Sequence, residues 1–279
     1  MPWHCNQLEM PLELSKALGG GDVFERVMEL QGQVFRDVPG RRTIRLNLAG
    51  HSCFVKLHFG VGWREIFKNL FSLRLPIVSA LTEWRAIRRL TELGIPTTPA
   101  VAYGCRGTSP ARWRSFVITE DLGDIISLED FCRDWAKNPP PLHLKRQLIS
   151  AVAHIAHTLH DNGLNHRDFY LCHFCLDAKR LSAGEIRIYL LDLHRMGIRS
   201  IILQSACKKD MAALYFSTLD IGLTRGDYLR FLCHYRGMRL RELFRSEQAF
   251  WVQVDRRARK LYNKFYGRWP VTPFDHTAI

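Results

Sequence analysis

The sequence predicts an α+β chain with two lobes, a β-rich first lobe and a mainly helical second lobe. Residues 33–59 alternate apolar and polar side chains and break at Pro39-Gly40 and Ala49-Gly50, which is typical of three antiparallel strands. A prolyl run at 139–141 precedes a stretch with apolar residues at every third or fourth position, which is typical of a long helix. With 279 residues the chain suits one domain, and we place its lobes at about residues 22–122 and 123–279.

In the first lobe we expect the three strands to be followed by one prominent helix and a further strand. The apolar positions of the three strands are Val34, Phe35, Ile44, Leu46, Leu48, Phe54, Val55 and Leu57. The stretch "SALTEWRAIRRLTELG" has helical spacing, with Ser79 as the expected N-cap and Gly94 as the C-terminal stop. The segment "RSFVITEDLG" reads as a strand that ends near residues 120–123, where we expect the boundary between the lobes.

In the second lobe the prolyl run introduces a helix from about Leu142 to Asn162, and Gly163 ends it. The apolar positions of this helix are Leu148, Val152, Ile155 and Leu159. The segment "EIRIYLLDLHR" predicts a strand that runs into Asp192, and the chain after Lys208 is expected to be helical.

The composition excludes a disordered chain and indicates an anionic partner. Hydrophobic residues make up 47% of the sequence, which is enough for a large core. The 40 Lys and Arg residues exceed the 27 Asp and Glu residues, so the formal net charge is +13. This excess fits a nucleotide, a nucleic acid, an anionic lipid or an acidic protein, and its sign does not distinguish them. The N-terminus "MPWHCNQLEM" lacks a secretion signal, so we expect a cytoplasmic protein with reduced cysteines.

The stretch "LNHRDFYLCHFC" combines metal-ligating residue types with a catalytic-loop tripeptide. Structural zinc needs four N or S ligands, usually in two short pairs, and Cys172-x-x-Cys175 supplies only one pair. His154, His157 and His160 lie three residues apart, so they spread around their helix and do not all converge. A zinc site is one alternative. We interpret both cysteines instead as small buried residues on a strand and predict that they hold no zinc.

The same stretch fits the catalytic loop of protein kinases and related phosphotransferases, where a helix, a turn and the segment H-R-D-x-x-x-x-N follow one another. Gly163 lies in the turn, and Asp168 completes the His-Arg-Asp tripeptide. His173 stands where that pattern has Asn, and Asp192 follows a strand where a metal-binding carboxylate is expected. The pattern predicts that Asp168 orients the acceptor hydroxyl and takes its proton, with Asp192 and His173 at the metal.

Two upstream residues strengthen this interpretation because they occur in the order of the kinase parts. Lys56 lies on the third strand and Glu83 on the helix that follows. Lys56 would hold the phosphates of ATP, and an ion pair with Glu83 would fix its ammonium group. Mg²⁺ prefers oxygen ligands, so Asp192 suits it better than His173 does. Taken alone, Lys56 also fits a strand-edge lysine and Glu83 a solvated helix residue.

The turn that would cover the phosphates, "VPGRRT", contains only one glycine, Gly40. We expect the guanidinium of Arg41, together with that of Arg42, to replace the backbone donors of a glycine-rich loop, and solvated turn arginines are an equal alternative. Glu120 and Leu122, at the strand end between the lobes, complete the expected ATP-binding residues.

Longer segments carry a resemblance to one family. These segments are "FVKLHFGVGWREIFKNL", "EWRAIRRLTELGIPT", "FVITEDL", "NHRDFYLCHF", "LDLHR" and "DMAALYFSTLDIGLTRGDYLRFL". Over about residues 33–265 the chain resembles the lipopolysaccharide core heptose(I) kinase family. The resemblance implies a two-lobed protein-kinase-like fold in one domain, residues 1–279, with ATP and Mg²⁺ as cofactors. It implies phosphorylation of the first inner-core heptose of lipopolysaccharide at its 4-hydroxyl, with Asp168 catalytic, and His173 also fits this family.

The resemblance further implies the partners. The substrate would be the lipopolysaccharide core glycolipid at the inner membrane surface, and acyl carrier protein is a second implied partner, whereas nucleic acid is not. Basic aromatic stretches at residues 59–75 and 250–269 would suit peripheral membrane contact, with core-packed basic helices as their alternative.

Two other functions remain open. A protein kinase or an antibiotic-type small-molecule kinase would share the fold, but no A-P-E segment follows Asp192. A basic zinc- or nucleic-acid-binding module would not account for Lys56, Glu83, Asp168 and Asp192 in this order.

Overall fold

The computed structural model describes residues 4–63, 67 and 79–275. The chain divides into two compact units. The first comprises Met1–Gly123 together with Leu193–Arg195, and the second comprises Asp124–Asp192 together with Met196–Ile279. Among the described residues, no helix combines the length and the apolar character that a bilayer crossing requires.

The first unit is built on a six-stranded antiparallel sheet with the order β1-β5-β6-β4-β3-β2. Its strands are β1 (Cys5–Glu9), β2 (Gln33–Val38), β3 (Arg41–Leu48), β4 (His51–His58), β5 (Ala100–Gly107) and β6 (Arg114–Glu120). The predicted meander is confirmed as β2, β3 and β4, with turns at the two predicted residue pairs. The strand expected in "RSFVITEDLG" is β6. β1 and β5, which pair with each other, were not predicted.

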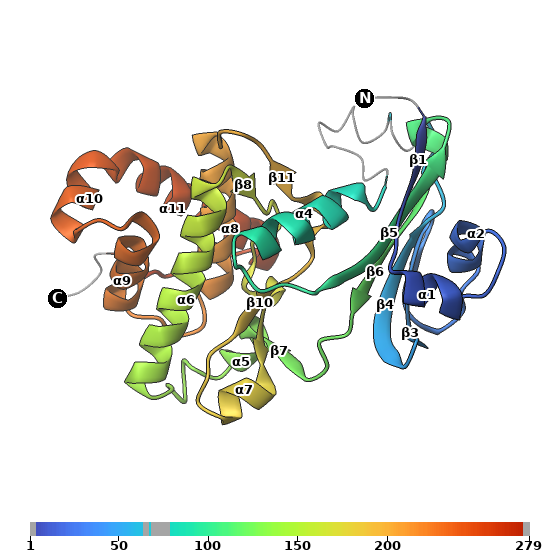
Figure 1. Cartoon of the computed structure of the whole chain (residues 1–279). Helices are drawn as coiled ribbons and strands as arrows, with labels where there is room; N and C mark the ends of the chain where they lie inside the picture. The colour runs from blue at the N-terminus through green and yellow to red at the C-terminus, as the bar shows by residue number, and fades with distance from the viewer. Residues whose placement is uncertain (1–3, 64–66, 68–78, 276–279) are drawn as a thin grey trace. The chain divides into compact units, whose positions relative to one another are not determined.

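Helices cover both faces of this sheet (Figure 1). The short helices α1 (Leu12–Ala17) and α2 (Val23–Met28) pack on the face that buries Val55 and Leu57 of β4. The N-terminal part of α4 (Leu81–Glu92) packs with β5 and β6 on the opposite face. Since successive strand residues point to opposite faces, Lys56 of β4 points to the side of α4. Alternation along β4 therefore decides where this lysine lies.

One expectation for the first unit needs correction. The N-cap of α4 is Ala80 rather than Ser79, and the Ser79 hydroxyl accepts a hydrogen bond from the Leu81 N–H at 3.3 Å. Val34 and Phe35 lie on β2 as predicted, and they are 55% and 53% exposed. They are exposed because β2 is the edge strand of the sheet.

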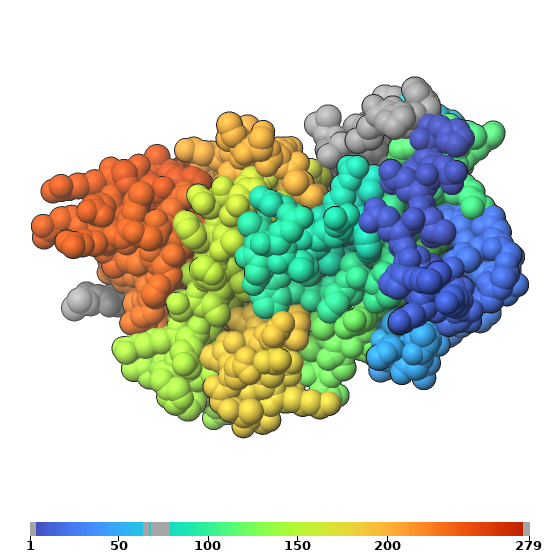
Figure 2. Space-filling model, viewed as in Figure 1, coloured from blue at the N-terminus to red at the C-terminus, as the bar shows by residue number. Residues whose placement is uncertain are grey.

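The second unit is mainly helical (Figure 1). Its helices are α5 (Leu128–Phe131), α6 (Leu142–Asp161), α7 (Ala178–Ser182), α8 (Gln204–Thr218), α9 (Arg225–Arg236), α10 (Leu240–Ser246) and α11 (Gln248–Tyr266). The predicted helix after the prolyl run is confirmed as α6, and its four predicted apolar positions are buried. In the space-filling view the last of these helices, orange to red, form the surface of the C-terminal part of the unit (Figure 2).

Short strands position the loop that follows α6. β8 (Leu164–Asn165) pairs with β11 (Gly197–Ile198), and β9 (Phe174–Asp177) lies between β7 (Ile125–Ser127) and β10 (Ile188–Leu190). The strand expected to run into Asp192 is β10, and it is shorter than predicted. At the start of the loop, Gly163 has φ +76°, and a Cβ there would lie 1.9 Å from the carbonyl oxygen of Arg199. Only glycine fits this turn, which explains why α6 ends there.

Candidate active site

Lys56 and Glu83 form an ion pair in the first unit, as their order in the sequence predicts. Lys56 lies in the middle of β4, opposite Thr43 of β3 and Val117 of β6. The Glu83 side chain, on the first turn of α4, is only 4% exposed, whereas that of Lys56 is 30% exposed. A buried carboxylate is costly without a charged partner. Glu83 therefore fixes the ammonium group of Lys56 while leaving part of it accessible.

His58, which lies two residues after Lys56 on β4, does not add a second positive charge. Burial lowers the pKa of His58 to about 3, and the positive charges of Arg41 and Lys56 act in the same direction. His58 is consequently neutral near pH 7. On this strand the positive charge is carried by Lys56.

The two arginines expected to contact phosphate, at the turn between β2 and β3, differ in their contacts. The Nε of Arg42 donates a hydrogen bond to the Asp37 carboxylate at 3.0 Å, so this side chain is held across its own hairpin. This ion pair favours the turn-arginine alternative for Arg42 over a phosphate contact. Arg41 is the first residue of β3 and lies opposite His58. Gly40 has φ +78°, and its carbonyl accepts a bond from the Phe59 N–H at 2.9 Å.

The other expected nucleotide-binding residues lie where β6 ends. Glu120 is the last residue of β6 and is exposed, and its backbone N–H donates to the Pro99 carbonyl at 3.0 Å. Leu122 is half-buried and immediately precedes Gly123, the last residue of this part of the first unit. Both lie in the same unit as the ion pair.

In the second unit the His-Arg-Asp loop is held by a carboxylate that the sequence analysis missed. Asp210 on α8 is fully buried, and its two oxygens accept hydrogen bonds from the backbone N–H groups of His166 at 2.7 Å and Arg167 at 2.9 Å. Arg167 has φ +73°, a conformation that costs a non-glycine residue about 1–3 kcal/mol. The two bonds to Asp210 hold this backbone, and they fix the residue that precedes Asp168.

Further bonds fix the loop beyond Asp168. The Tyr170 N–H donates to the Asp168 carbonyl at 2.9 Å. The Leu171 N–H donates to the Ser217 hydroxyl of α8 at 3.0 Å. α8 thus holds the loop on both sides of Asp168, so its position is set by the helical core.

His173 and Asp192 lie close together at the end of the loop. The His173 carbonyl accepts a bond from the Leu191 N–H at 2.9 Å, and the Leu191 carbonyl accepts one from Nε2–H of His166 at 2.9 Å. Burial lowers the pKa of His166, so its ring is neutral. The Nε2 of His173 is 3.9 Å from Oδ2 of Asp192, and Asp192 has φ +62°. The backbone of this segment is therefore arranged to bring the two side chains together.

This pair fits a magnesium ion that is shared with a nucleotide. Mg²⁺ is usually held by one or two carboxylates, with phosphate oxygens and waters completing the shell. Asp192 supplies such a carboxylate, and both side chains are partly exposed. The described part of the chain contains no group of three or more His, Cys, Asp and Glu residues able to hold a metal. A site completed by nucleotide oxygens does not require one.

His160 and Tyr235 extend the network of contacts around Asp210. The Nδ1 of His160 is 2.6 Å from the Tyr235 hydroxyl, and its Nε2 is 3.4 Å from Asp210. Both ring nitrogens therefore face protein groups, so His160 is not available as a zinc ligand. The signal that could have revealed this network was Asp210 itself, an acidic residue among the apolar positions of a buried helix.

The Asp210 network gives a first prediction. Asp210→Ala leaves two buried N–H groups without an acceptor, and each such loss costs about 1–3 kcal/mol. We expect a lower melting temperature and a lower kcat, measured by thermal unfolding and by phosphate transfer. Asp210→Asn keeps one acceptor oxygen, so it should fall between wild type and Asp210→Ala in both measurements. Unchanged stability and unchanged kcat in the Ala variant would contradict the role of Asp210.

The two cysteines of the loop region differ in position. Cys175 is buried on β9, as predicted, whereas Cys172 lies on the one-turn 3₁₀ helix η2 (Leu171–His173) and is half-buried. The Cys175 thiol faces the Cys172 carbonyl at 3.9 Å. Burial raises the pKa of both thiols, that of Cys175 to about 11. Zinc binds thiolates, and these environments favour the thiol. That the two cysteines hold no zinc stays a prediction.

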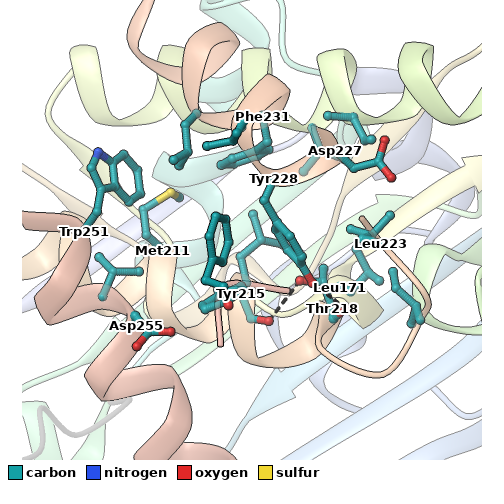
Figure 3. A pocket seen from close by; sticks show the side chains of 18 of the residues that line it. Leu171, Met211, Tyr215, Thr218, Leu223, Asp227, Tyr228, Phe231, Trp251 and Asp255 are labelled. Atoms are coloured by element: carbon teal, nitrogen blue, oxygen red, sulfur yellow. Dashed lines mark hydrogen bonds between the residues drawn. The ribbon is translucent and has the colours of Figure 1, made fainter. Parts of the chain in front are cut away.

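The second unit also contains an apolar cavity of about 450 Å³ (Figure 3). Side chains from α6, α8, α9, α10 and α11 and from the segment between α8 and α9 line it, among them Leu148, Met211, Tyr215, Leu223, Tyr228, Phe231 and Trp251. Both of its carboxylates are paired, Asp227 with Lys145 at 2.9 Å and Asp255 at 2.8 Å with Arg259, which also lines the cavity. The cavity therefore offers an apolar wall rather than a charged site.

The order of these parts is that of a protein-kinase-like fold. A β-rich unit carries a lysine on the third strand of a meander, paired with a glutamate on the next helix. A helical unit carries the His-Arg-Asp loop after its long helix and an aspartate after a short strand. The two-lobed α+β class expected from the sequence is confirmed.

Comparisons with known proteins agree with this arrangement. The model of the lipopolysaccharide kinase (Kdo/WaaP) family matches residues 25–235. The lipopolysaccharide core heptose(I) kinase WaaP of Pseudomonas aeruginosa is 48% identical over 92% of this chain and 96% of that protein. The WaaP of Escherichia coli is 44% identical over 87% of this chain and 92% of its own length. A solved structure, WaaP in complex with acyl carrier protein, has a TM-score of 0.79 at 44% identity and covers 92% of this chain and 99% of that one. The chain therefore belongs to the lipopolysaccharide kinase (Kdo/WaaP) family.

Proposed function

We propose that this protein is an ATP- and Mg²⁺-dependent kinase that phosphorylates the first heptose of the lipopolysaccharide inner core at its 4-hydroxyl. The identity of 44–48% to heptose(I) kinases over most of the chain carries this proposal. The Lys56–Glu83 ion pair and the anchored His-Arg-Asp loop support it, because both are parts that phosphoryl transfer requires. The two units would act as the N-lobe and C-lobe of one kinase domain.

Each residue then has a defined task. Lys56, held by Glu83, binds the nucleotide phosphates, and Arg41 adds positive charge at the turn that covers them. Glu120 and Leu122 contact the nucleotide from the end of β6. Mg²⁺, bound by Asp192 with His173 beside it, would neutralise charge on the transferred phosphoryl group.

Asp168 acts on the acceptor. Its carboxylate orients the heptose hydroxyl and accepts its proton as the oxygen attacks phosphorus. The bonds from α8 to the loop on either side of Asp168 keep this carboxylate in place, which is the positioning that phosphoryl transfer depends on.

The decisive experiment is transfer from labelled ATP to lipopolysaccharide that lacks core phosphate. We expect label on the heptose and its position at the 4-hydroxyl by fragmentation or NMR. A protein substrate and an aminoglycoside test the two alternative kinase functions in the same assay. Label on either of these but not on lipopolysaccharide would overturn the proposal.

The metal site gives a second prediction. Asp192→Asn removes a charged oxygen ligand, so the Mg²⁺ concentration needed for half-maximal activity should rise. His173→Asn replaces imidazole by the amide oxygen of the protein-kinase pattern, so Mg²⁺-dependent activity should persist. Titration of activity with Mg²⁺ at saturating ATP distinguishes the two variants. An unchanged Mg²⁺ requirement in Asp192→Asn would contradict its assignment.

Acyl carrier protein is the proposed protein partner. The structure of WaaP in complex with acyl carrier protein supports this proposal, as does the net charge of +13, which suits an acidic protein. Acyl carrier proteins carry acyl chains, and the apolar cavity of the second unit has the environment that such a chain requires.

This partner gives a third prediction. Acylated carrier protein should bind more tightly than the carrier without an acyl group, measured by calorimetry with each form. A polar substitution of similar size in the cavity wall, Leu232→Gln, should reduce this difference. Equal affinity of the two carrier forms would remove the cavity from the proposal.

We also propose that the enzyme works in the cytoplasm, at the periphery of the inner membrane, where its glycolipid substrate is made. Of the two basic aromatic stretches expected at the membrane, residues 59–75 lie largely outside the described residues. The other stretch, residues 250–269, lies almost entirely on α11.

A further inference from the structure

The C-terminal end of α11 exposes a group of large apolar side chains. Phe265 is 73% exposed, Tyr266 51%, Trp269 61% and Val271 81%. We call these four residues the α11 end. Single exposed apolar residues are ordinary, but four within seven positions of the chain form a patch that needs an explanation.

The surroundings of the α11 end are basic. Lys260, Lys264 and Arg268 are exposed on the last turns of α11 and just beyond it. Among the described residues, neither lysine makes an ion pair. The Nη2 of Arg268 is 3.9 Å from Oδ2 of Asp220. The other nearby acids, Asp255 and Asp275, are both paired with Arg259. The patch thus combines apolar side chains with two exposed lysines and with Arg268, which is paired with the exposed Asp220.

Two of the exposed rings, those of Phe265 and Tyr266, contact rings of the helices beneath them. The Tyr266 ring centroid is 4.5 Å from that of Tyr262, whose hydroxyl donates to Asp220 at 2.8 Å. The centroid of the Phe216 ring, on α8, is 6.0 Å from Phe265 and 6.2 Å from Tyr266. Rings supported in this way present a fixed surface, so little conformational freedom is lost when a partner covers them.

The same support leads to the catalytic loop. Phe216 also lies 6.0 Å, between ring centroids, from Tyr170, whose N–H bonds the Asp168 carbonyl. The next residue of α8, Ser217, accepts the Leu171 N–H. The α11 end and the loop that would hold the acceptor hydroxyl are therefore fixed to one another through a single turn of α8.

We propose that the α11 end is the surface by which this enzyme rests on an anionic lipid bilayer. Aromatic rings favour the interface between headgroups and acyl chains, and lysines are attracted to the phosphates of an anionic leaflet. This inference rests on the proposed function, because the acceptor heptose belongs to a lipid in that bilayer. Seating the α11 end on the bilayer brings the catalytic loop to the surface that displays the acceptor.

Vesicle sedimentation tests the surface without any turnover. The probes are vesicles of phosphatidylcholine alone and of phosphatidylcholine with phosphatidylglycerol. Each lysine near an anionic surface contributes a factor of about five to binding, so Lys260→Ser/Lys264→Ser should weaken binding to the anionic vesicles by at least about tenfold. Phe265→Ser/Trp269→Ser should weaken binding to the same vesicles as well, because it removes the side chains that enter the interface.

Matched controls come from exposed residues elsewhere in the second unit. Leu142→Ser removes an apolar side chain that is 53% exposed, and Lys137→Ser removes an exposed lysine. Both controls should bind vesicles as wild type does, and all variants should keep the wild-type melting temperature. Equal binding by wild type and both double variants would overturn the proposal, as would an equal loss in the controls.

Kinetics on two acceptors then connect the surface to activity. With lipopolysaccharide embedded in vesicles, the double variants should show a higher KM at unchanged kcat. With the deacylated, water-soluble core oligosaccharide they should match wild type. If wild type transfers no phosphate to either acceptor, the proposed function fails while the vesicle result still decides this inference. A loss of activity on the soluble acceptor would instead assign the α11 end to sugar binding and overturn the membrane proposal.

Discussion

Replacing Asp168 with Ala is expected to lower kcat for heptose phosphorylation by about 10²–10⁴-fold, the range found when a general base is removed. Asp168 follows a residue with φ +73° whose N–H is bound by Asp210, and its own carbonyl accepts the Tyr170 N–H. None of these backbone bonds uses the Asp168 side chain. The variant should therefore keep its loop and lose the group that takes the proton.

Stability and substrate binding separate this effect from misfolding. Asp168→Ala should unfold in one cooperative thermal transition and should still bind ATP, which a misfolded variant would not do. Asp168→Asn keeps the shape but not the basicity, so its kcat should fall similarly. Asp161→Ala, an exposed carboxylate at the end of α6, serves as the control and should leave kcat unchanged. Near-normal turnover by the Ala variant would remove Asp168 from the chemistry.

The sequence predicted the strands and helices whose position depends on the residues within them and next to them. The meander of β2, β3 and β4 follows from strict alternation and two turn-forming pairs, and α6 follows from its prolyl start and its apolar spacing. β1 and β5 were missed because they stabilise each other across about ninety residues of chain, and five residues of β1 carry no clear alternation. Short helices such as α1 and α2 are likewise held by packing on the sheet rather than by propensity.

The residues of the candidate site also fall into two groups, those that a motif indicates and those that only long-range contacts reveal. Lys56, Glu83, Asp168 and Asp192 were proposed as site residues because their order along the chain follows a known mechanism. The contacts of Asp210 with His166 and of His160 with Tyr235 join residues 44 and 75 positions apart, and no motif marks such pairs. The roles proposed for Arg41, Glu120 and Leu122 remain predictions from position. The sequence alone leaves the contact of Arg42 open, and in the structure its guanidinium is paired with the carboxylate of Asp37.

Lys56→Ala should lower kcat/KM by about 10²–10³-fold, the loss typical of removing one preorganised charge or donor from a transition state. Lys56 lies opposite Thr43 and Val117 in the middle of the sheet, and its ammonium group is held by a carboxylate that is almost fully buried. In the Ala variant Glu83 loses its partner, so stability should also fall, because an unpaired buried carboxylate is costly. The double variant Lys56→Ala/Glu83→Gln removes that buried charge and separates the two effects.

If Lys56 acts on the nucleotide, the double variant should regain stability but not activity. Glu83→Gln alone keeps the lysine and loses the charge that orients it, so it should show a smaller fall in kcat/KM than Lys56→Ala. Lys16→Ala, at an exposed lysine of α1, is the control for loss of positive charge in the same unit and should match wild type. Recovery of activity together with stability in the double variant would mean that Lys56 serves only to neutralise Glu83, and the phosphate-binding role would be withdrawn.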